Sequence, residues 1–241
     1  MDSVAPSPVT TVSVWDLPLR LFHWLLVATT AFAAISGYLG AGWLEWHARA
    51  GVAILALVLF RLLWGVLGST HARFTEFFPS PARLRAYSRG AWRGLGHNPL
   101  GALAMLAILA STAAQAVTGL FSNDEIAFEG PLASLVSGET SNRATWLHEV
   151  VFIILLSLVA LHLAAIAFHT WVGRQSLVLP MVTGSKLAPS ELARSSEGGG
   201  ALRFLVALAV AAMLAWSVGS GQLTRHLAPP PVPSAPPQPA W

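Results

Sequence analysis

The chain has 241 residues, of which 54% are hydrophobic and only 10% charged, and its formal net charge at pH 7 is +3. Soluble domains carry about 25% charged residues, so this composition excludes an ordinary soluble protein and indicates an integral membrane protein. The absence of cysteine excludes disulfides, cysteine-bound iron–sulfur clusters and covalently attached c-type haem. The small excess of basic residues reports membrane topology, and we expect no nucleic-acid partner.

Five apolar segments follow one another along the chain. The last is rich in alanine and slightly short for a membrane span. They predict an all-α integral membrane protein: a four-helix transmembrane bundle with a fifth, C-terminal transmembrane helix. The N-terminus lacks the basic region of a signal peptide, so we expect it to stay in the cytoplasm. The segments cover about Leu17–Leu39, His47–Leu67, Leu100–Phe121, Trp146–His169 and Phe204–Gly219.

The loops predict the topology. The loop from Ser69 to His97 carries five arginines and one acid, whereas the next long loop carries four acids against Arg143 alone. The positive-inside rule places the first loop in the cytoplasm and the second on the other side of the membrane. The N-terminus then lies inside and the Pro-rich C-terminal tail outside, as a disordered or polyproline-like extension.

The fourth segment carries the main functional signal. His148 and His162 are 14 positions apart, with no Asp, Glu, Lys or Arg between Val150 and Gly173. In a helix this spacing puts both imidazoles on one face, about 21 Å apart along the axis. Ionisable residues within a span are costly and usually functional. Two such histidines at two depths are typical of a helix that holds two haems, one near each membrane surface.

Two further histidines lie at matching depths. His23 is near the cytoplasmic end of the first segment, and His47 opens the second segment at the opposite surface. We therefore predict an inner pair, His23 with His162, and an outer pair, His47 with His148. Each pair is expected to hold one b-type haem between two imidazoles, without a covalent bond.

Other polar residues have simpler interpretations or weaker roles. Gly37, at the outer level, is expected to let a porphyrin approach, and Arg61, at the inner level, to pair with haem propionates. A single histidine in a span often only bonds a neighbouring helix, but four at matched depths favour ligation. His169, at the membrane exit, has a weaker claim to a role. The histidines of the loops and tail are interpreted as solvated: His71, His97 and His226.

Six short motifs follow one another along the chain. They are VWDLPLRLFHW (Val14–Trp24), WHARAG (Trp46–Gly51), RLLWGVLGSTHARF (Arg61–Phe74), GHNPLGA (Gly96–Ala102), TGLF (Thr118–Phe121) and LVLPMVTG (Leu177–Gly184). In this order they resemble the bacterial cytochrome b561 family, which includes the cytochrome b subunits of membrane-bound nickel–iron hydrogenases. The resemblance covers about Val14 to Lys186. We accordingly divide the chain into a cytoplasmic N-terminal segment (1–13), a di-haem four-helix membrane domain (14–186), a linker with the fifth helix (187–221) and the tail (222–241).

The resemblance implies a function and a location. It implies a multi-pass protein of the bacterial inner membrane that moves electrons between a quinone pool and a periplasmic redox partner, a hydrogenase-like enzyme or a c-type cytochrome. The family's ligand positions fall on the same four histidines. Its quinone site, beside the inner haem, maps to His97 and Asn98, with His169 a further candidate. An imidazole such as His97 would shuttle protons there at neutral pH. The fifth segment and the tail depart from the family pattern.

Two other functions remain open from the residues alone. A membrane metal transporter could use intramembrane histidines, but it would need carboxylates along a polar path, and the spans offer almost none. A membrane scaffold could use them only for packing, and the fifth segment and the tail would suit it. For the electron-transfer function we expect no catalytic residue on the chain itself.

Overall fold

The computed structural model describes residues 8–192 and 195–227. Five of its helices are long and apolar enough, by length and composition, to cross a membrane. This confirms the prediction of an all-α membrane protein with a four-helix bundle and a fifth long helix. The five helices are α1 (Leu17–Leu39), α2 (Leu44–Leu67), α5 (Pro99–Phe121), α6 (Gly138–Trp171) and α8 (Gly200–Gly219).

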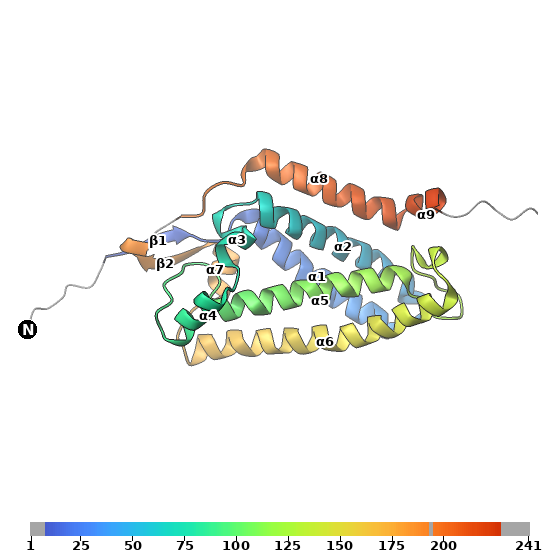
Figure 1. The fold of residues 1–241 in the computed structure, drawn as a ribbon, viewed down its shortest axis with the longest axis horizontal. Helices are drawn as coiled ribbons and strands as arrows, with labels where there is room; N and C mark the ends of the chain where they lie inside the picture. Colours follow the sequence, from blue (N-terminus) through green and yellow to red (C-terminus); the bar gives the residue numbers. More distant parts are fainter. Residues whose placement is uncertain (1–7, 193–194, 228–241) are drawn as a thin grey trace, which may run out of the picture.

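The long helices pack as two hairpins with one addition. Helix α1 packs on α2, α6 packs on α5, and the hairpins meet where α2 packs on α5. Helix α8 lies along the outer side of α2, away from α6 (Figure 1). It approaches closely because the residues that face α2 are small and recur every fourth position. These are the buried residues Ala207, Ala211 and Ala215.

Short elements close the two ends of the bundle (Figure 1). The strands, α3, α4 and α7 gather at one end, and α9 lies at the other, near the loop that joins α5 to α6. The short elements are β1 (Val9–Ser13), α3 (Phe74–Phe77), α4 (Pro81–Ser88), α7 (Val178–Thr183), β2 (Ser185–Pro189) and α9 (Gln222–Leu227), with 3₁₀ turns at Ala41–Trp43, Thr70–Ala72, Ala133–Leu135 and Ser190–Leu192.

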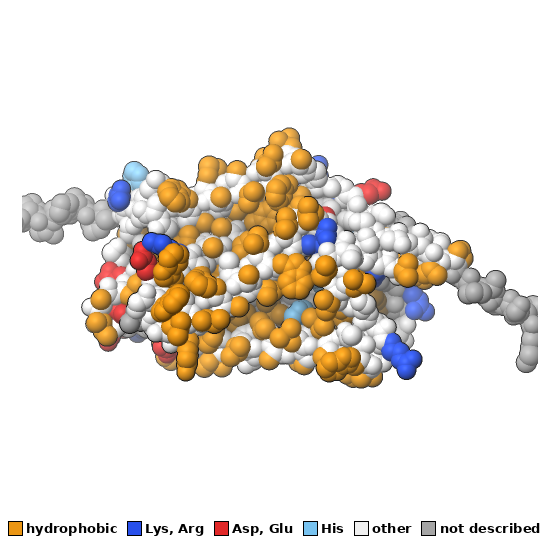
Figure 2. Space-filling model, turned by 180° about the vertical axis from the view of Figure 1, so that it is seen from behind, with side chains coloured by type: hydrophobic (Ala, Val, Ile, Leu, Met, Phe, Trp, Pro, Cys, Tyr) orange, Lys and Arg blue, Asp and Glu red, His pale blue; other side chains and the backbone are white. Residues whose placement is uncertain are grey.

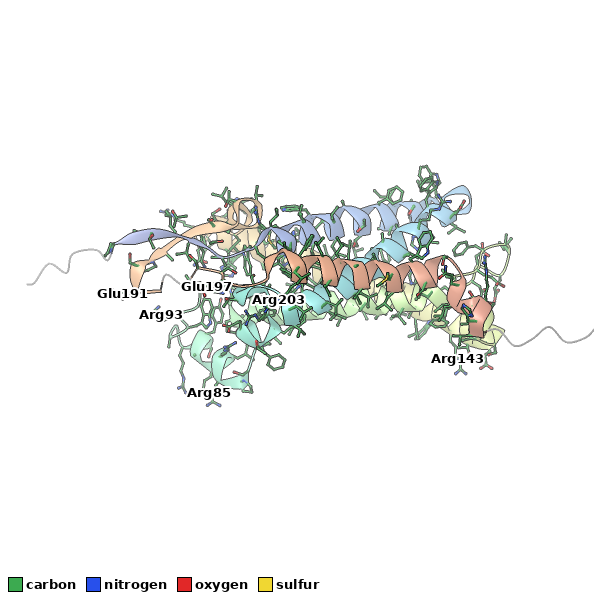
Figure 3. The ribbon with its side chains drawn as sticks, turned by 90° about the horizontal axis from the view of Figure 1, so that it is seen from above. Arg85, Arg93, Arg143, Glu191, Glu197 and Arg203 are labelled. Carbon is green, nitrogen blue, oxygen red and sulfur yellow. The ribbon has the colours of Figure 1, made fainter. Side chains whose placement is uncertain are left out.

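The two ends differ in charge. We call the end with the 69–97 loop the basic end and the end with the 122–137 loop the acidic end. Arg85, Arg93 and Arg203 lie at the basic end, and Arg143 lies at the opposite end (Figure 3). Apolar side chains cover the surface between the ends (Figure 2). This banded surface is the one that a lipid bilayer requires.

The basic end contains a β-ribbon that the sequence pattern did not predict. Strand β1 pairs antiparallel with β2, from Val9 opposite Pro189 to Ser13 opposite Ser185. Part of the N-terminal segment is therefore held against the chain that follows α6 and α7. Residues 1–7 of that segment lie outside the described residues. Pairing over such a sequence distance depends on how the bundle brings the two segments together, so local patterns do not predict it.

Two helix limits also differ from the predictions. Helix α6 begins at Gly138 rather than near Trp146, because Ser137 caps it by accepting a hydrogen bond from the backbone N–H of Thr140. The segment 222–227, which was assigned to the tail, forms the helix α9, ahead of the Pro-rich run that was predicted to be extended. The rest of the tail, residues 228–241, lies outside the described residues.

Asp16 connects the start of α1 to the end of α2. One carboxylate oxygen accepts from the backbone N–H of Leu19 at 2.8 Å and caps α1. The other accepts from the indole N–H of Trp64 at 2.9 Å. Trp64 is 1% exposed, so its N–H has little access to water.

Replacing Asp16 should therefore destabilise the basic end. Asp16→Ala removes a helix cap, worth about 1 kcal/mol, and leaves a buried indole N–H unpaired, which costs about 1–3 kcal/mol. We expect a lower midpoint of thermal unfolding in detergent. Asp16→Asn keeps an oxygen for the cap but has no second acceptor for Trp64. Its unfolding midpoint should lie between those of the wild type and of Asp16→Ala. Equal midpoints for all three proteins would contradict this role.

Candidate functional site

The outer pair joins the two hairpins near the acidic end. The ring centroids of His47, on α2, and His148, on α6, are 5.9 Å apart, and the ring planes meet at 83°. Metal–imidazole bonds about 2.0–2.1 Å long would place two such rings about 6 Å apart across one metal. The spacing therefore fits one metal held between the two imidazoles.

Hydrogen bonds orient both outer imidazoles. Nδ1 of His47 donates to the backbone carbonyl of Ala33, on α1, at 2.8 Å, because a carbonyl can only accept. Nδ1 of His148 lies 3.2 Å from the hydroxyl of Thr118, and its Nε2 lies 2.9 Å from the amide nitrogen of Gln115, both on α5. A second hydrogen bond that fixes the orientation of the ring is typical of metal-binding histidines.

Two glycines make room for these rings. A Cβ at Gly37 would lie 2.9 Å from Nδ1 of His47, and a Cβ at Gly119 would lie 2.9 Å from Cε1 of His148. Either contact would force the imidazole to move. Gly37 was predicted to make room for a porphyrin, whereas in the structure it lies directly against the imidazole of His47.

The inner pair lies toward the basic end. His23, on α1, and His162, on α6, are close enough to interact electrostatically. Nδ1 of His23 is buried and has no hydrogen-bond partner among the described residues. The ring of Trp24 meets the His23 ring edge-on, with centroids 5.0 Å apart. A buried polar nitrogen without a partner is costly.

Helix α6 is largely exposed along its length. Of its residues only Ser141 and Leu155 are buried, and both of its ligand candidates, His148 and His162, are only half-buried. A histidine side chain is visible within the apolar surface of the bundle (Figure 2). The paired imidazoles and the closely approaching glycines together fit the requirements of haem, which would lie between the hairpins.

Arg61 is buried at the level of the inner pair, with 2% of its surface exposed. Its guanidinium carbon lies 4.7 Å from the ring centroid of Phe74 and 5.8 Å from that of Phe77. Nη1 of Arg61 has no hydrogen-bond partner among the described residues. The predicted contact with propionates stays a prediction, which this unpaired donor supports.

The predicted quinone-site residues lie together beyond the inner pair. His97 is held between the rings of Trp15 and Phe77, at centroid distances of 4.7 and 5.1 Å. Burial, followed by the charge of Arg61, lowers the pKa of His97 to about 3. The imidazole is therefore neutral at pH 7, and its expected role as a proton shuttle stays a prediction. Because an unfolded histidine titrates near about 6.5, stability that depends on the neutral form is lost as the pH falls below that value.

A cavity of about 300 Å³ opens beside His97. It lies under the 69–97 loop, with His71, Arg83 and Trp92 also in its wall. The oxygen of Asn98 accepts from the backbone N–H of Gly101 at 2.7 Å and caps α5, so this side chain has a structural role of its own. His169, the weaker candidate, lies in the last turn of α6.

Sequence reasoning assigned no site residue to α5 beyond Asn98 at its start, although the TGLF motif lies on this helix. Gln115, Thr118 and Gly119 lie three and four residues apart and therefore share one face of the helix. Two of them bond His148 and the third lies against it. A polar and small-residue patch on one face of an otherwise apolar span was the signal that could have identified them.

Comparisons with known proteins agree with this geometry. Residues 14–184 match the family model described as prokaryotic cytochrome b561. The chain is 28% identical over 217 residues to the probable Ni/Fe-hydrogenase B-type cytochrome subunit of Azotobacter chroococcum, covering 74% of this chain and 89% of that protein. The protein of the same description from Azotobacter vinelandii is 27% identical over 217 residues, covering 74% of this chain and 89% of that protein. The one from Cupriavidus necator is 27% identical over 210 residues, covering 71% of this chain and 85% of that protein.

No solved structure gives a significant match. The family match spans α1 to α7 and contains all four predicted haem ligands. Electron transfer in a membrane, with haem b as the cofactor, follows from it. This chain belongs to the prokaryotic cytochrome b561 family.

Proposed function

We propose that this protein holds two b haems, one at the outer pair and one at the inner pair, and carries electrons across the membrane between a redox enzyme and quinone. The observation that carries this proposal is the pair of opposed imidazoles, His47 and His148, 5.9 Å apart. The inner pair, His23 with His162, lies on the same two hairpins and would hold the second haem near the opposite surface of the membrane. The metal-transporter and scaffold functions are disfavoured because the chain belongs to a cytochrome family.

The chain's own residues determine what the haems can do. Haem b supplies reversible one-electron exchange at its iron. His47 with His148, and His23 with His162, would each hold one haem iron and leave it no open site for oxygen or substrate. The apolar helices exclude water, and the buried cation of Arg61 at the inner level favours the less positive, reduced state. Electron transfer without bond chemistry is the function that such ligation supports.

We place the basic end in the cytoplasm of a bacterium and the acidic end in the periplasm, on the positive-inside rule. The protein then lies in the inner membrane, with β1 and the N-terminus on the cytoplasmic side. The similar proteins are described as hydrogenase cytochrome subunits. A Ni/Fe-hydrogenase that docks at the acidic end is therefore our proposed partner, with a c-type cytochrome as the alternative.

We place the quinone at the cavity beside His97, near the inner pair. A volume of about 300 Å³ is at the lower end of the range for small-molecule sites, which is about 300–1,000 Å³. A neutral imidazole can donate one hydrogen bond to a quinone carbonyl. Asn98 would shape the site by capping α5, and His169 is a further candidate for its wall.

The ligand assignment predicts haem stoichiometry. A pyridine haemochrome assay of the purified protein should give two b haems per chain, and His148→Ala should give one. His226→Ala, in the exposed helix α9, is the matched control and should keep two. Two haems in the His148→Ala protein would show that the outer pair is misassigned. Absence of haem from the wild type, expressed with haem available, would refute the function.

The glycine contacts predict a steric effect on the outer haem. Gly37→Ala places a methyl group within 2.9 Å of Nδ1 of His47 and should lower the haem content from two to one. Gly51→Ala is the matched control, since a Cβ there has no atom within 4 Å. Haem content is measured from the Soret absorbance per protein. Equal content in both variants would mean that Gly37 does not limit the site.

The quinone placement predicts a kinetic effect. His97→Ala removes one hydrogen bond to the quinone and should raise the KM for a soluble quinone analogue by about threefold to tenfold, from the usual net strength of such a bond. The haem content should stay at two per chain, and His226→Ala should leave the KM unchanged. An unchanged KM in the His97→Ala protein would locate the quinone elsewhere.

A further inference from the structure

The hydroxyl of Thr118 determines which nitrogen of His148 carries the proton. Thr118 Oγ1 donates its one hydrogen to the backbone carbonyl of Ala114 at 2.8 Å. Toward Nδ1 of His148, 3.2 Å away, the oxygen can then only accept. Nδ1 must therefore be the protonated nitrogen, and Nε2 must present its lone pair.

Gln115 gives independent support for this tautomer. Its amide nitrogen is a donor only, and it lies 2.9 Å from Nε2 of His148. A donor at that position requires an unprotonated Nε2, in agreement with the hydrogen bond of Thr118. The lone pair of Nε2 is taken up by Gln115, so iron at Nε2 would have to displace this donor, and Gly119 lies against the same ring.

The outer ligands share a feature that His23 of the inner pair lacks. Nδ1 of His47 donates to the carbonyl of Ala33 at 2.8 Å, and Nδ1 of His148 donates to Thr118. Nδ1 of His23, by contrast, is buried without a partner among the described residues. The buried cation of Arg61 lies at the inner level. The two levels of the bundle therefore differ both in hydrogen bonding and in charge.

We propose that Thr118 is a positioning residue for His148 whose hydrogen bond makes the outer haem the lower-potential haem of the two. This inference rests on the proposed ligation by the outer and inner pairs. An acceptor on Nδ1–H makes an imidazole a stronger electron donor to the metal, which stabilises the oxidised iron and lowers its potential. At the inner level, Nδ1 of His23 has no acceptor and Arg61 adds a positive charge. Both features raise the potential of the inner haem.

A redox titration of the haem absorbance of the full-length protein tests the proposal. The wild type should show two transitions, and Thr118→Val should shift only the lower one upward. We expect a threefold to tenfold change in that reduction equilibrium, which is about 28–59 mV for one electron. Thr118→Ser keeps the hydroxyl and should restore the wild-type potential, an outcome that a purely steric role of Thr118 would not produce.

A matched control lies on the same helix. Thr112 is 2% exposed, and its hydroxyl donates to the carbonyl of Ile108 at 2.8 Å. Thr112→Val makes the same chemical change away from the histidines, so both potentials should stay at their wild-type values. Should Thr118→Val fail to assemble, Thr118→Ala removes the hydroxyl without adding bulk and should give the same upward shift.

Three outcomes would overturn the proposal, and they can be told apart from failure of the proposed function. Two haems with unchanged potentials in the Thr118→Val protein would refute the role of Thr118 but leave the proposed haem ligation intact. A shift of the higher transition would refute the order of potentials. Absence of a haem at the outer pair in the wild-type protein would refute both the inference and the proposed ligation.

Discussion

The spacing of His148 and His162 on one face of α6 is the constraint on which the rest of the bundle depends. A helix fixes the two rings about 21 Å apart, so any partner must lie at one of two depths. The α1–α2 hairpin meets this requirement by carrying His23 toward the basic end and His47 near the acidic end. The hairpins join through α2 and α5.

Hydrogen bonding in an apolar environment explains how the outer rings are positioned. Serine and threonine hydroxyls in such helices donate to carbonyls of the preceding turn, as Thr118 does to Ala114. That bond leaves the threonine oxygen free to accept and so fixes the tautomer of His148. One local hydrogen bond thereby links the sequence of α5 to the ring nitrogen on α6 that we propose binds iron, and through it to the redox properties that we propose.

At the basic end, side-chain hydrogen bonds and a β-ribbon hold the connecting segments together. Asp16 joins α1 to α2, and the β1–β2 ribbon holds the N-terminal segment against the chain after α7. The side chain of Lys186 donates to the carbonyl of Leu95, and burial lowers the pKa of its amine. The loop that carries His97 is therefore tied to β2. These contacts hold the 69–97 loop over the cavity in which we place the quinone.

The sequence by itself determined the five spans, the two depths and the four histidines, because helical periodicity and apolar length are local properties. Only the tertiary structure decided the partners of those histidines. Whether Thr118 or Gly119 meets His148 depends on how α5 is rotated against α6, and Gly37 meets His47 only because α1 and α2 pack closely. The pairing of β1 with β2 also depends on the tertiary structure. Each is a contact between segments whose approach depends on the packing of the whole bundle, which no local pattern encodes.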